Sequence, residues 1–301
     1  MKTTENLRHA AEYLPSGVRQ SVQKLDAARS ARVQEIRLRA GRPVCLTIAG
    51  NSALLAPDGT ITRNPAAALV SSQEELMHSF QAVMSYSVHS HQNDIASGFV
   101  TIRGGCRVGI CGTAVRQGES IQSVRSISGM NFRIAGEYPG AAASVFQQVG
   151  GTGGILAAGA PGTGKTTFLR DYCRLLGDRH RTALVDERGE LAAVWRGIPQ
   201  HDVGLMTDVL DGYPRAQGIL TALRVMTPEH IVCDELSGQE DAAAVIAAAG
   251  SGVGLTASVH AGSFEDLAQR EVLAPLLKAG VFRYCVMLSG VGQVQSVRRL
   301  S

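Results

Sequence analysis

The sequence predicts an α/β protein of two domains, and three observations carry this prediction. The chain has 301 residues, which exceeds the length of one ordinary domain. Its composition, 45% hydrophobic and 18% charged, supplies a sizeable core and excludes a disordered or low-complexity chain. In the second half, short apolar runs alternate with helical patterns, which is typical of a parallel sheet covered by helices on both faces.

The first half predicts a smaller α+β domain over residues 1–140. Helical spacing, alternation of polar and apolar residues, and turn residues define its elements. They are helices over 5–30 and 71–84, strands over 34–48 and 131–134, and a hairpin over 99–115 that turns at Gly104-Gly105. A Ser-x-x-Glu pattern, Ser71 to Glu74, is the expected cap of the second helical segment. The Glu-Tyr-Pro-Gly stretch at 137–140 is the candidate linker.

The second half, residues 141–301, predicts the parallel sheet. The apolar runs are 155–158, 182–185, 231–233 and 255–259, and the clearest helical patterns cover 168–176 and 239–249. In an open parallel sheet, ligands bind at the carboxyl ends of the strands. Polar residues that directly follow these four runs are therefore the candidates for a site.

Charge and cysteine usage narrow the function classes. The net charge is +3, but residues 1–150 hold 15 Lys and Arg against 10 Asp and Glu. Nearly all of these basic residues are arginines. Arginine binds phosphate and carboxylate with a planar fork, although codon usage explains such a bias equally well. Aromatic residues make up only 5%, which disfavours a base-stacking nucleic-acid surface, so no nucleic-acid partner is expected.

Six cysteines without a Cys-x-x-Cys pair favour neither a disulfide framework nor a zinc site. The first residues lack the apolar core of a signal peptide, and the longest uncharged stretch, 242–259, is broken by glycines. We therefore expect a soluble, cytoplasmic protein.

A phosphate-binding loop follows the first apolar run. The pattern G-x-x-x-x-G-K-[ST] is matched at every fixed position by Gly159, Ala160, Pro161, Gly162, Thr163, Gly164, Lys165 and Thr166, and Thr167 opens the helix that follows. The glycines let successive backbone N–H groups point at phosphate oxygens, reinforced by the helix N-terminus. Lys165 is expected to reach the β- and γ-phosphates of ATP, and the Thr166 hydroxyl to ligate Mg²⁺.

Three further runs end in polar residues. The run 231–233 leads into Asp234-Glu235, where an Asp holds Mg²⁺ and the adjacent Glu orients or deprotonates the attacking water. The run 182–185 leads into Asp186-Glu187-Arg188-Gly189-Glu190, and 255–259 leads into His260. Their convergence on one sheet edge indicates an ATP-hydrolysing site.

These motifs, in the order GAPGTGKTT, VDERGEL, LRVMTPEHIVCDEL and TASVHAGS, resemble the ring-forming ATPases of type II and type IV secretion and of type IV pili. The stretches EIRLRAGRPVCLTIAGN, GFVTIRGGCRVGICGTAV, SISGMNFRIAGE and DVLDGYPRAQGILTALR are similar to the stage III sporulation protein AA family of endospore-forming bacteria. That resemblance runs from about residue 30 to the C-terminus.

The resemblance implies a C-terminal RecA-like P-loop NTPase domain and a PAS-like N-terminal domain. It assigns Asp186, Glu187 and Glu190 to an acidic box and His260 to a γ-phosphate sensor. It also implies a hexameric ring in which N-terminal arginines, here Arg103, Arg107 and Arg133, close over the nucleotide, with Arg224 a weaker candidate.

The same resemblance implies the setting. The ring would lie peripherally at the inner face of the membrane, on the mother-cell side, and energise channel proteins of a secretion-like complex during sporulation.

Alternatives remain open at this point. A RecA-like nucleic-acid motor and a nucleotide-binding ring scaffold without turnover fit the same motifs. His89 and His91 could share a strand face as metal ligands, although no third ligand is near in sequence. We expect the Trp195 side chain to pack in the fold and not to stack on an adenine.

Overall fold

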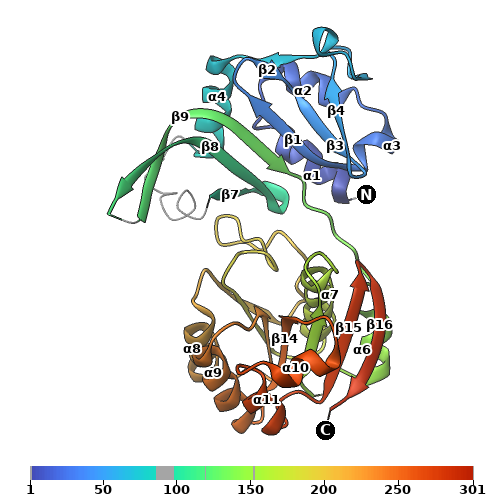
Figure 1. Cartoon of the computed structure of the whole chain (residues 1–301), viewed down its shortest axis with the longest axis vertical. Helices are drawn as coiled ribbons and strands as arrows, with labels where there is room; N and C mark the ends of the chain where they lie inside the picture. Colours follow the sequence, from blue (N-terminus) through green and yellow to red (C-terminus); the bar gives the residue numbers. More distant parts are fainter. Residues whose placement is uncertain (1, 86–97, 119, 152, 301) are drawn as a thin grey trace. The chain divides into compact units, whose positions relative to one another are not determined.

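The computed structural model describes residues 2–85, 98–118, 120–151 and 153–300, which form two compact units, Met1–Glu137 and Tyr138–Ser301 (Figure 1). Each unit has its own hydrophobic core, and we describe each by itself. No helix in the described part of the chain is both long enough and apolar enough to cross a bilayer.

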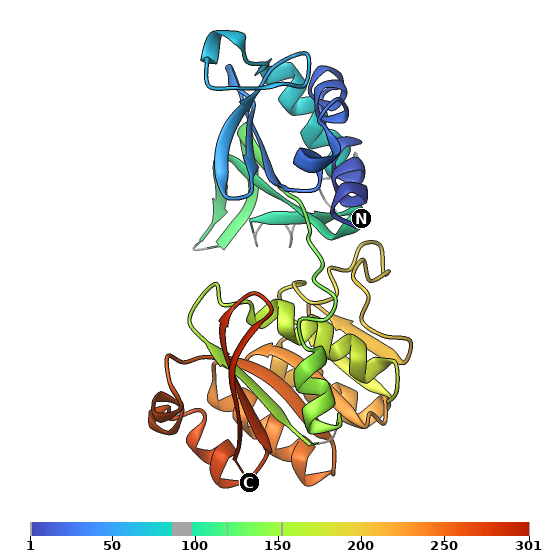
Figure 2. The same ribbon diagram turned by 90° about the vertical axis from the view of Figure 1, so that its right-hand side faces the viewer.

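Unit 1 is a seven-stranded antiparallel sheet in the order β5-β4-β3-β1-β9-β8-β7. Its strands are β1 (Val33–Arg39), β3 (Cys45–Ile48), β4 (Asn51–Leu55), β5 (Ile61–Thr62), β7 (Phe99–Ile102), β8 (Cys106–Gln117) and β9 (Ser120–Arg133). Two short strands, β2 (Arg42–Pro43) and β6 (Val70–Ser71), pair separately. The helices are α1 (Lys2–Ala11), α2 (Ser16–Gln23), α3 (Ala27–Ser30) and α4 (Gln73–Val83), and Figure 2 shows them gathered on one side of the sheet.

The alternating burial of side chains along β1 shows why helices cover only one face of the sheet. Ile36 and Leu38 are fully buried against the helices, whereas Glu35 and Arg37 point to the other face and are half-buried. Strand side chains alternate between faces, so a period-2 pattern fixes which face meets the core. The open face of this sheet therefore carries the polar residues of β1, β8 and β9.

Two boundaries in unit 1 differ from the sequence prediction. The cap of α4 is one residue later than expected, because Ser72 and Glu75 form the reciprocal capping box and Ser71 lies buried in β6. The strand expected at 131–134 is the end of the much longer β9, whose polar first half does not alternate cleanly enough to be recognised.

Unit 2 is a seven-stranded sheet in the order β12-β11-β13-β14-β10-β15-β16, parallel except for β16. Its strands are β10 (Ile155–Gly159), β11 (Thr182–Asp186), β12 (Thr207–Asp211), β13 (His230–Glu235), β14 (Gly254–His260), β15 (Tyr284–Gly290) and β16 (Gln293–Arg299). The helices are α6 (Ala143–Val149), α7 (Lys165–Gly177), α8 (Arg215–Val225), α9 (Gln239–Gly250), α10 (Phe264–Gln269) and α11 (Ala274–Lys278).

Both faces of this sheet are buried, as the apolar runs predict. On β10, Ile155 and Ala157 pack with α6 and α7, whereas Leu156 and Ala158 pack with α8, α9 and α11. The expected parallel sheet with helices on both faces is therefore confirmed. The sequence prediction missed β12, β15 and β16: β12 is polar and half-exposed and β16 is largely exposed, whereas β15 is a buried apolar run that was overlooked.

Candidate nucleotide-binding site

The loop between β10 and α7 has the geometry of an anion cradle. Gly162 and Gly164 adopt left-handed backbone conformations, with φ of 78° and 88°. A side chain at Gly164 would also collide with the backbone of Val291, since a Cβ there would lie 2.8 Å from its Cα. The first turn of α7, which includes Thr166 and Thr167, has no side-chain cap, so its N–H groups face whatever occupies the loop.

The amine of Lys165 lies directly over this loop. Lys165 is 7% exposed, and its Nζ donates to the carbonyl oxygens of Gly159 and Ala160, each at 2.8 Å. Burial lowers the pKa of Lys165 below its ordinary value, and the carboxylate of Glu235 acts in the opposite direction. A phosphate entering the loop would therefore meet a donor that is already in place, held by carbonyls it can exchange for phosphate oxygens.

His260 connects this lysine to Glu235. Strand β14 lies between β10 and β13, and His260 is the register partner of Gly159. Its Nδ1 lies 2.9 Å from Lys165 Nζ, and its Nε2 lies 2.9 Å from Glu235 Oε2. A protonated amine only donates, so Nδ1 accepts and Nε2 carries the proton toward Glu235. The start of α7 and the ends of β14 and β13 thus form one chain of contacts, from Lys165 through His260 to Glu235.

Asp234 lies beside this chain, in contact with an arginine that sequence analysis missed. Arg215, the first residue of α8, is 5% exposed, and its Nε and Nη2 donate to Asp234 Oδ1 at 3.0 and 2.6 Å. Burial raises the pKa of Asp234, and the guanidinium acts against that rise. Arg224, the weaker candidate from this segment, lies exposed on the same helix, where it donates to the Leu220 carbonyl, and its action on nucleotide stays a prediction.

The acidic segment after β11 divides into two roles. Asp186 is fully buried, and its carboxylate accepts hydrogen bonds from the backbone N–H groups of Glu190, Leu191 and Ala192. This arrangement argues that Asp186 shapes the loop and does not contact nucleotide. Glu187 reaches Arg215, with Oε2 at 2.8 Å from Nη2, and Glu190 is half-buried in the loop that Asp186 closes.

The three N-terminal arginines lie in unit 1. Arg107 on β8 and Arg133 on β9 are direct register partners on the open face of the sheet. The guanidinium of Arg107 lies 4.4 Å from the centre of the Phe99 ring, and Arg133 Nε lies 3.9 Å from Glu35 Oε1. Arg103 is exposed in a short 3-10 segment, η3 (Arg103–Gly105). Their action on nucleotide stays a prediction.

Three other candidates from the sequence are His89, His91 and Trp195. His89 and His91 lie outside the described residues, and the described part of the chain holds no group of three or more His, Cys, Asp or Glu that could bind a metal. Trp195 is half-buried in the loop before β12, where Arg196 stacks over its ring.

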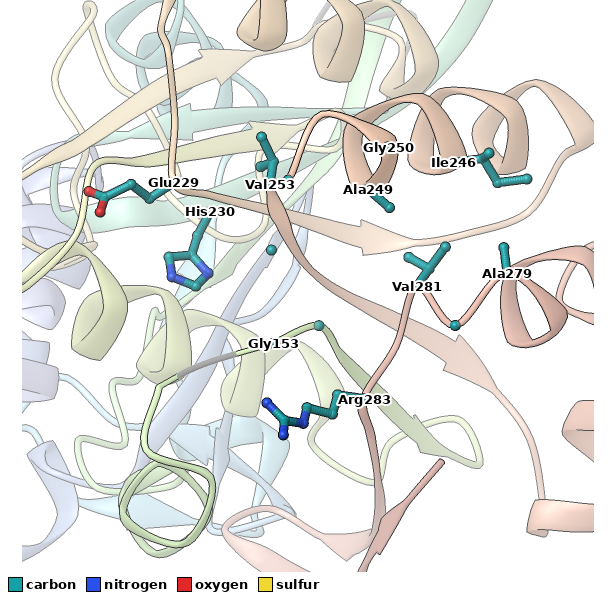
Figure 3. A pocket seen from close by; sticks show the side chains of 14 residues that line it. Gly153, Glu229, His230, Ile246, Ala249, Gly250, Val253, Ala279, Val281 and Arg283 are labelled. Carbon is teal, nitrogen blue, oxygen red and sulfur yellow. The ribbon is translucent and has the colours of Figure 1, made fainter. Parts of the chain in front are cut away.

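A pocket of about 620 Å³ lies at the opposite edge of the unit 2 sheet (Figure 3). It is lined by the residues where β10, β13, β14 and β15 begin, so it faces away from the phosphate loop. Glu229 and His230 lie at one end and Ile246 and Ala279 at the other, with Arg283 below them in this view. Among the residues that the structure describes, Nδ1 of the buried His230 has no hydrogen-bond partner, and burial together with His180 lowers the pKa of His230 to about 4. This pocket is distinct from the nucleotide-binding site.

The fold and site together define a class. The sheet is parallel, with a phosphate loop after β10, an Asp-Glu pair at the end of β13, and β14 between these two strands. This arrangement defines a RecA-like P-loop domain. Two solved structures share the fold. The Legionella pneumophila ATPase DotB matches with a TM-score of 0.55 and 16% identity over 91% of this chain and 76% of that chain. The pilus retraction motor PilT with bound ADP matches with a TM-score of 0.56 and 14% identity over 88% and 77%.

The particular family follows from sequence similarity over both units. The family model of sporulation stage III, protein AA, matches residues 5–300, and the chain belongs to this family. Stage III sporulation protein AA of Bacillus subtilis (strain 168) is 33% identical over 302 aligned residues, which cover 97% of this chain and 94% of that protein.

Proposed function

We propose that this protein is a Mg²⁺-dependent ATPase that drives a membrane complex during sporulation. The observation that carries the proposal is the chain of contacts from Lys165 through His260 to Glu235 beside the phosphate loop. It joins the group that binds phosphate to the carboxylate that orients water, which is what hydrolysis of a bound nucleotide requires.

The residues present fit ATP and Mg²⁺. Backbone N–H groups of residues 162–167 and the Lys165 amine suit phosphate oxygens, since they are donors at a glycine-rich loop and a helix N-terminus. Mg²⁺ prefers oxygen ligands, and the Thr166 hydroxyl and the Asp234 carboxylate supply them. When bound, Mg²⁺ neutralises charge on the β- and γ-phosphates.

The chain's own residues then have separate roles. Glu235 accepts a hydrogen bond from the attacking water and orients it. His260 contacts that carboxylate and the Lys165 amine through its two ring nitrogens. Movement of the lysine to the γ-phosphate would break one of these contacts, and in this way His260 senses the γ-phosphate.

We further propose an assembly by resemblance to secretion and pilus motors. The protein would form a hexameric ring in which Arg103, Arg107 or Arg133 closes over nucleotide. The ring would bind channel proteins at the inner face of the membrane, on the mother-cell side. Measuring particle size with and without ATP and Mg²⁺ tests the ring, and a monomer under both conditions contradicts it.

The decisive experiment replaces Glu235 with Gln. Loss of a water-orienting carboxylate is expected to lower the hydrolysis rate by about 100- to 10,000-fold while ATP still binds. Glu240→Gln is the matched control, because Glu240 is an exposed carboxylate on the neighbouring helix α9. Unchanged phosphate release by Glu235→Gln overturns the catalytic assignment.

Two other outcomes favour the alternative functions. Absence of phosphate release from the wild-type ring with membranes and partners supports the scaffold alternative, and stimulation of ATP hydrolysis by single-stranded DNA supports a nucleic-acid motor.

A further inference from the structure

Arg215 is the centre of a buried cluster of charges. Its guanidinium contacts three carboxylates from three different elements: Asp234 at the end of β13, Asp241 in the first turn of α9, and Glu187 after β11. Nη1 donates to Asp241 Oδ2 at 2.8 Å, and Nη2 lies 2.8 Å from Glu187 Oε2. Only a guanidinium offers donors in this divergent fork, because the ammonium of lysine is a single point.

The contacts on Asp234 are one-sided. Both donors of Arg215 that reach Asp234 bond to Oδ1, and within the described residues no hydrogen bond reaches Oδ2. A fork that holds one oxygen fixes the rotation of the whole carboxylate and therefore the direction of the other oxygen. Oδ2 is thus the oxygen left to accept from a metal-bound water or to ligate a cation.

The cluster also carries surplus negative charge. One buried guanidinium faces two buried carboxylates, Asp234 and Asp241, whereas Glu187 is exposed, so one buried negative charge is left over. Buried charge is stable only when it is paired, so this imbalance favours a cation close to the cluster.

We propose that Arg215 is a positioning residue for the Mg²⁺ site. It holds Asp234 Oδ1 so that Oδ2 faces the metal, and it ties this orientation to α9 through Asp241 and to the loop after β11 through Glu187. Arg215 contacts neither nucleotide nor metal itself. The inference rests on the proposed function, because it needs a chain that binds nucleotide with Mg²⁺.

The test separates metal positioning from general stability by measuring one binding reaction in two conditions. Affinity for trinitrophenyl-ATP is measured in EDTA, where the phosphate loop and Lys165 alone hold the phosphates, and then during a Mg²⁺ titration. Arg215→Lys keeps the charge and loses the fork. We expect its Mg²⁺ midpoint to rise by about 10- to 100-fold, as for other residues that orient a metal ligand. Its affinity in EDTA is expected to stay within about threefold of wild type.

Two further variants keep the test sharp. Arg270→Lys is the matched control, because Arg270 is an exposed arginine at the end of α10 in the same unit, and its Mg²⁺ midpoint is expected to equal that of wild type. Asp241→Asn weakens the contact between Arg215 and α9 while Asp234 and Arg215 themselves are kept, and it is expected to raise the midpoint less than Arg215→Lys does. It covers the case in which Arg215→Lys does not fold.

The outcomes are distinct. A folded Arg215→Lys or Asp241→Asn protein with the wild-type Mg²⁺ midpoint overturns the inference alone. An equal loss of affinity for trinitrophenyl-ATP in EDTA and in Mg²⁺ also overturns the inference, since that pattern means a purely structural role for Arg215. A wild-type chain that binds no nucleotide overturns the proposed function and this inference with it.

Discussion

Replacement of Asp186 tests whether this carboxylate builds the loop after β11 or binds nucleotide. Its two oxygens accept from the backbone N–H groups of Glu190, Leu191 and Ala192 at 2.8–3.0 Å. Leu191 and Ala192 are fully buried, so Asp186→Ala leaves two donors without an acceptor, each costing about 1–3 kcal/mol, and a third that is half-buried. We expect a loss of about 3–6 kcal/mol, a large share of the 5–15 kcal/mol typical of a domain.

Asp186→Asn is the milder variant. It keeps one carbonyl oxygen but turns an NH₂ group toward a backbone N–H, so we expect a loss of about 1–3 kcal/mol. A loss of 2 kcal/mol lowers the urea midpoint by about 1 M at a slope near 2 kcal/mol/M.

The assay is urea unfolding followed by tryptophan fluorescence. Trp195 is the single tryptophan of the chain and lies in unit 2, so its signal reports the unit that contains Asp186. Asp208→Asn is the control, an exposed carboxylate on the adjacent strand β12 that is expected to change stability by less than about 0.5 kcal/mol. If Asp186→Asn keeps the wild-type midpoint but loses ATP affinity, the structural role is wrong and the acidic-box assignment is right.

Two further predictions follow. Gly164→Ala is expected to weaken nucleotide binding and lower the melting temperature, because Gly164 has φ of 88° and a Cβ there would meet the backbone of Val291. Gly250→Ala is the control, since a Cβ at this exposed end of α9 meets open space and should change little, and equal melting curves for the two variants contradict the prediction. His230 is neutral in the fold with a pKa of about 4 against an ordinary 6.5, so the unfolded chain binds the extra proton and stability is lost as pH falls from about 6.5 to 4. The loss in the free energy of unfolding is at most about 3 kcal/mol, at about 1.4 kcal/mol per pKa unit. His230→Gln should remove this pH dependence. The prediction is contradicted if the urea midpoint falls equally in wild type and in His230→Gln between pH 7.5 and pH 4.5.

The phosphate loop and the strand ends could be predicted from sequence because each is a local pattern. A buried parallel strand is an uninterrupted apolar run, and the residues that follow it are at the carboxyl edge of the sheet wherever the strand lies. That rule predicted Lys165, Asp234, Glu235 and His260 at one edge, and the contacts of Lys165 with His260 and of His260 with Glu235 agree with it.

Arg215 could not be found in this way. It is separated by 19 residues from Asp234 and by 26 from Asp241, and nothing in its neighbours distinguishes it from Arg224 nine positions later. The start of α8 turns one arginine inward and the end of the same helix leaves the other in solvent. Only the packing of α8 against β11, β13 and α9 decides which of them meets the carboxylates.

The sequence by itself determined the parallel sheet, the phosphate loop and the identity of the groups at the strand ends, because these depend on near neighbours along the chain. The tertiary structure alone decided how the acidic residues are used: Asp186 in a buried turn, Glu187 and Asp234 on Arg215. The physical reason is that a carboxylate binds whichever donor lies within about 3 Å, and that donor is set by strand order and helix packing.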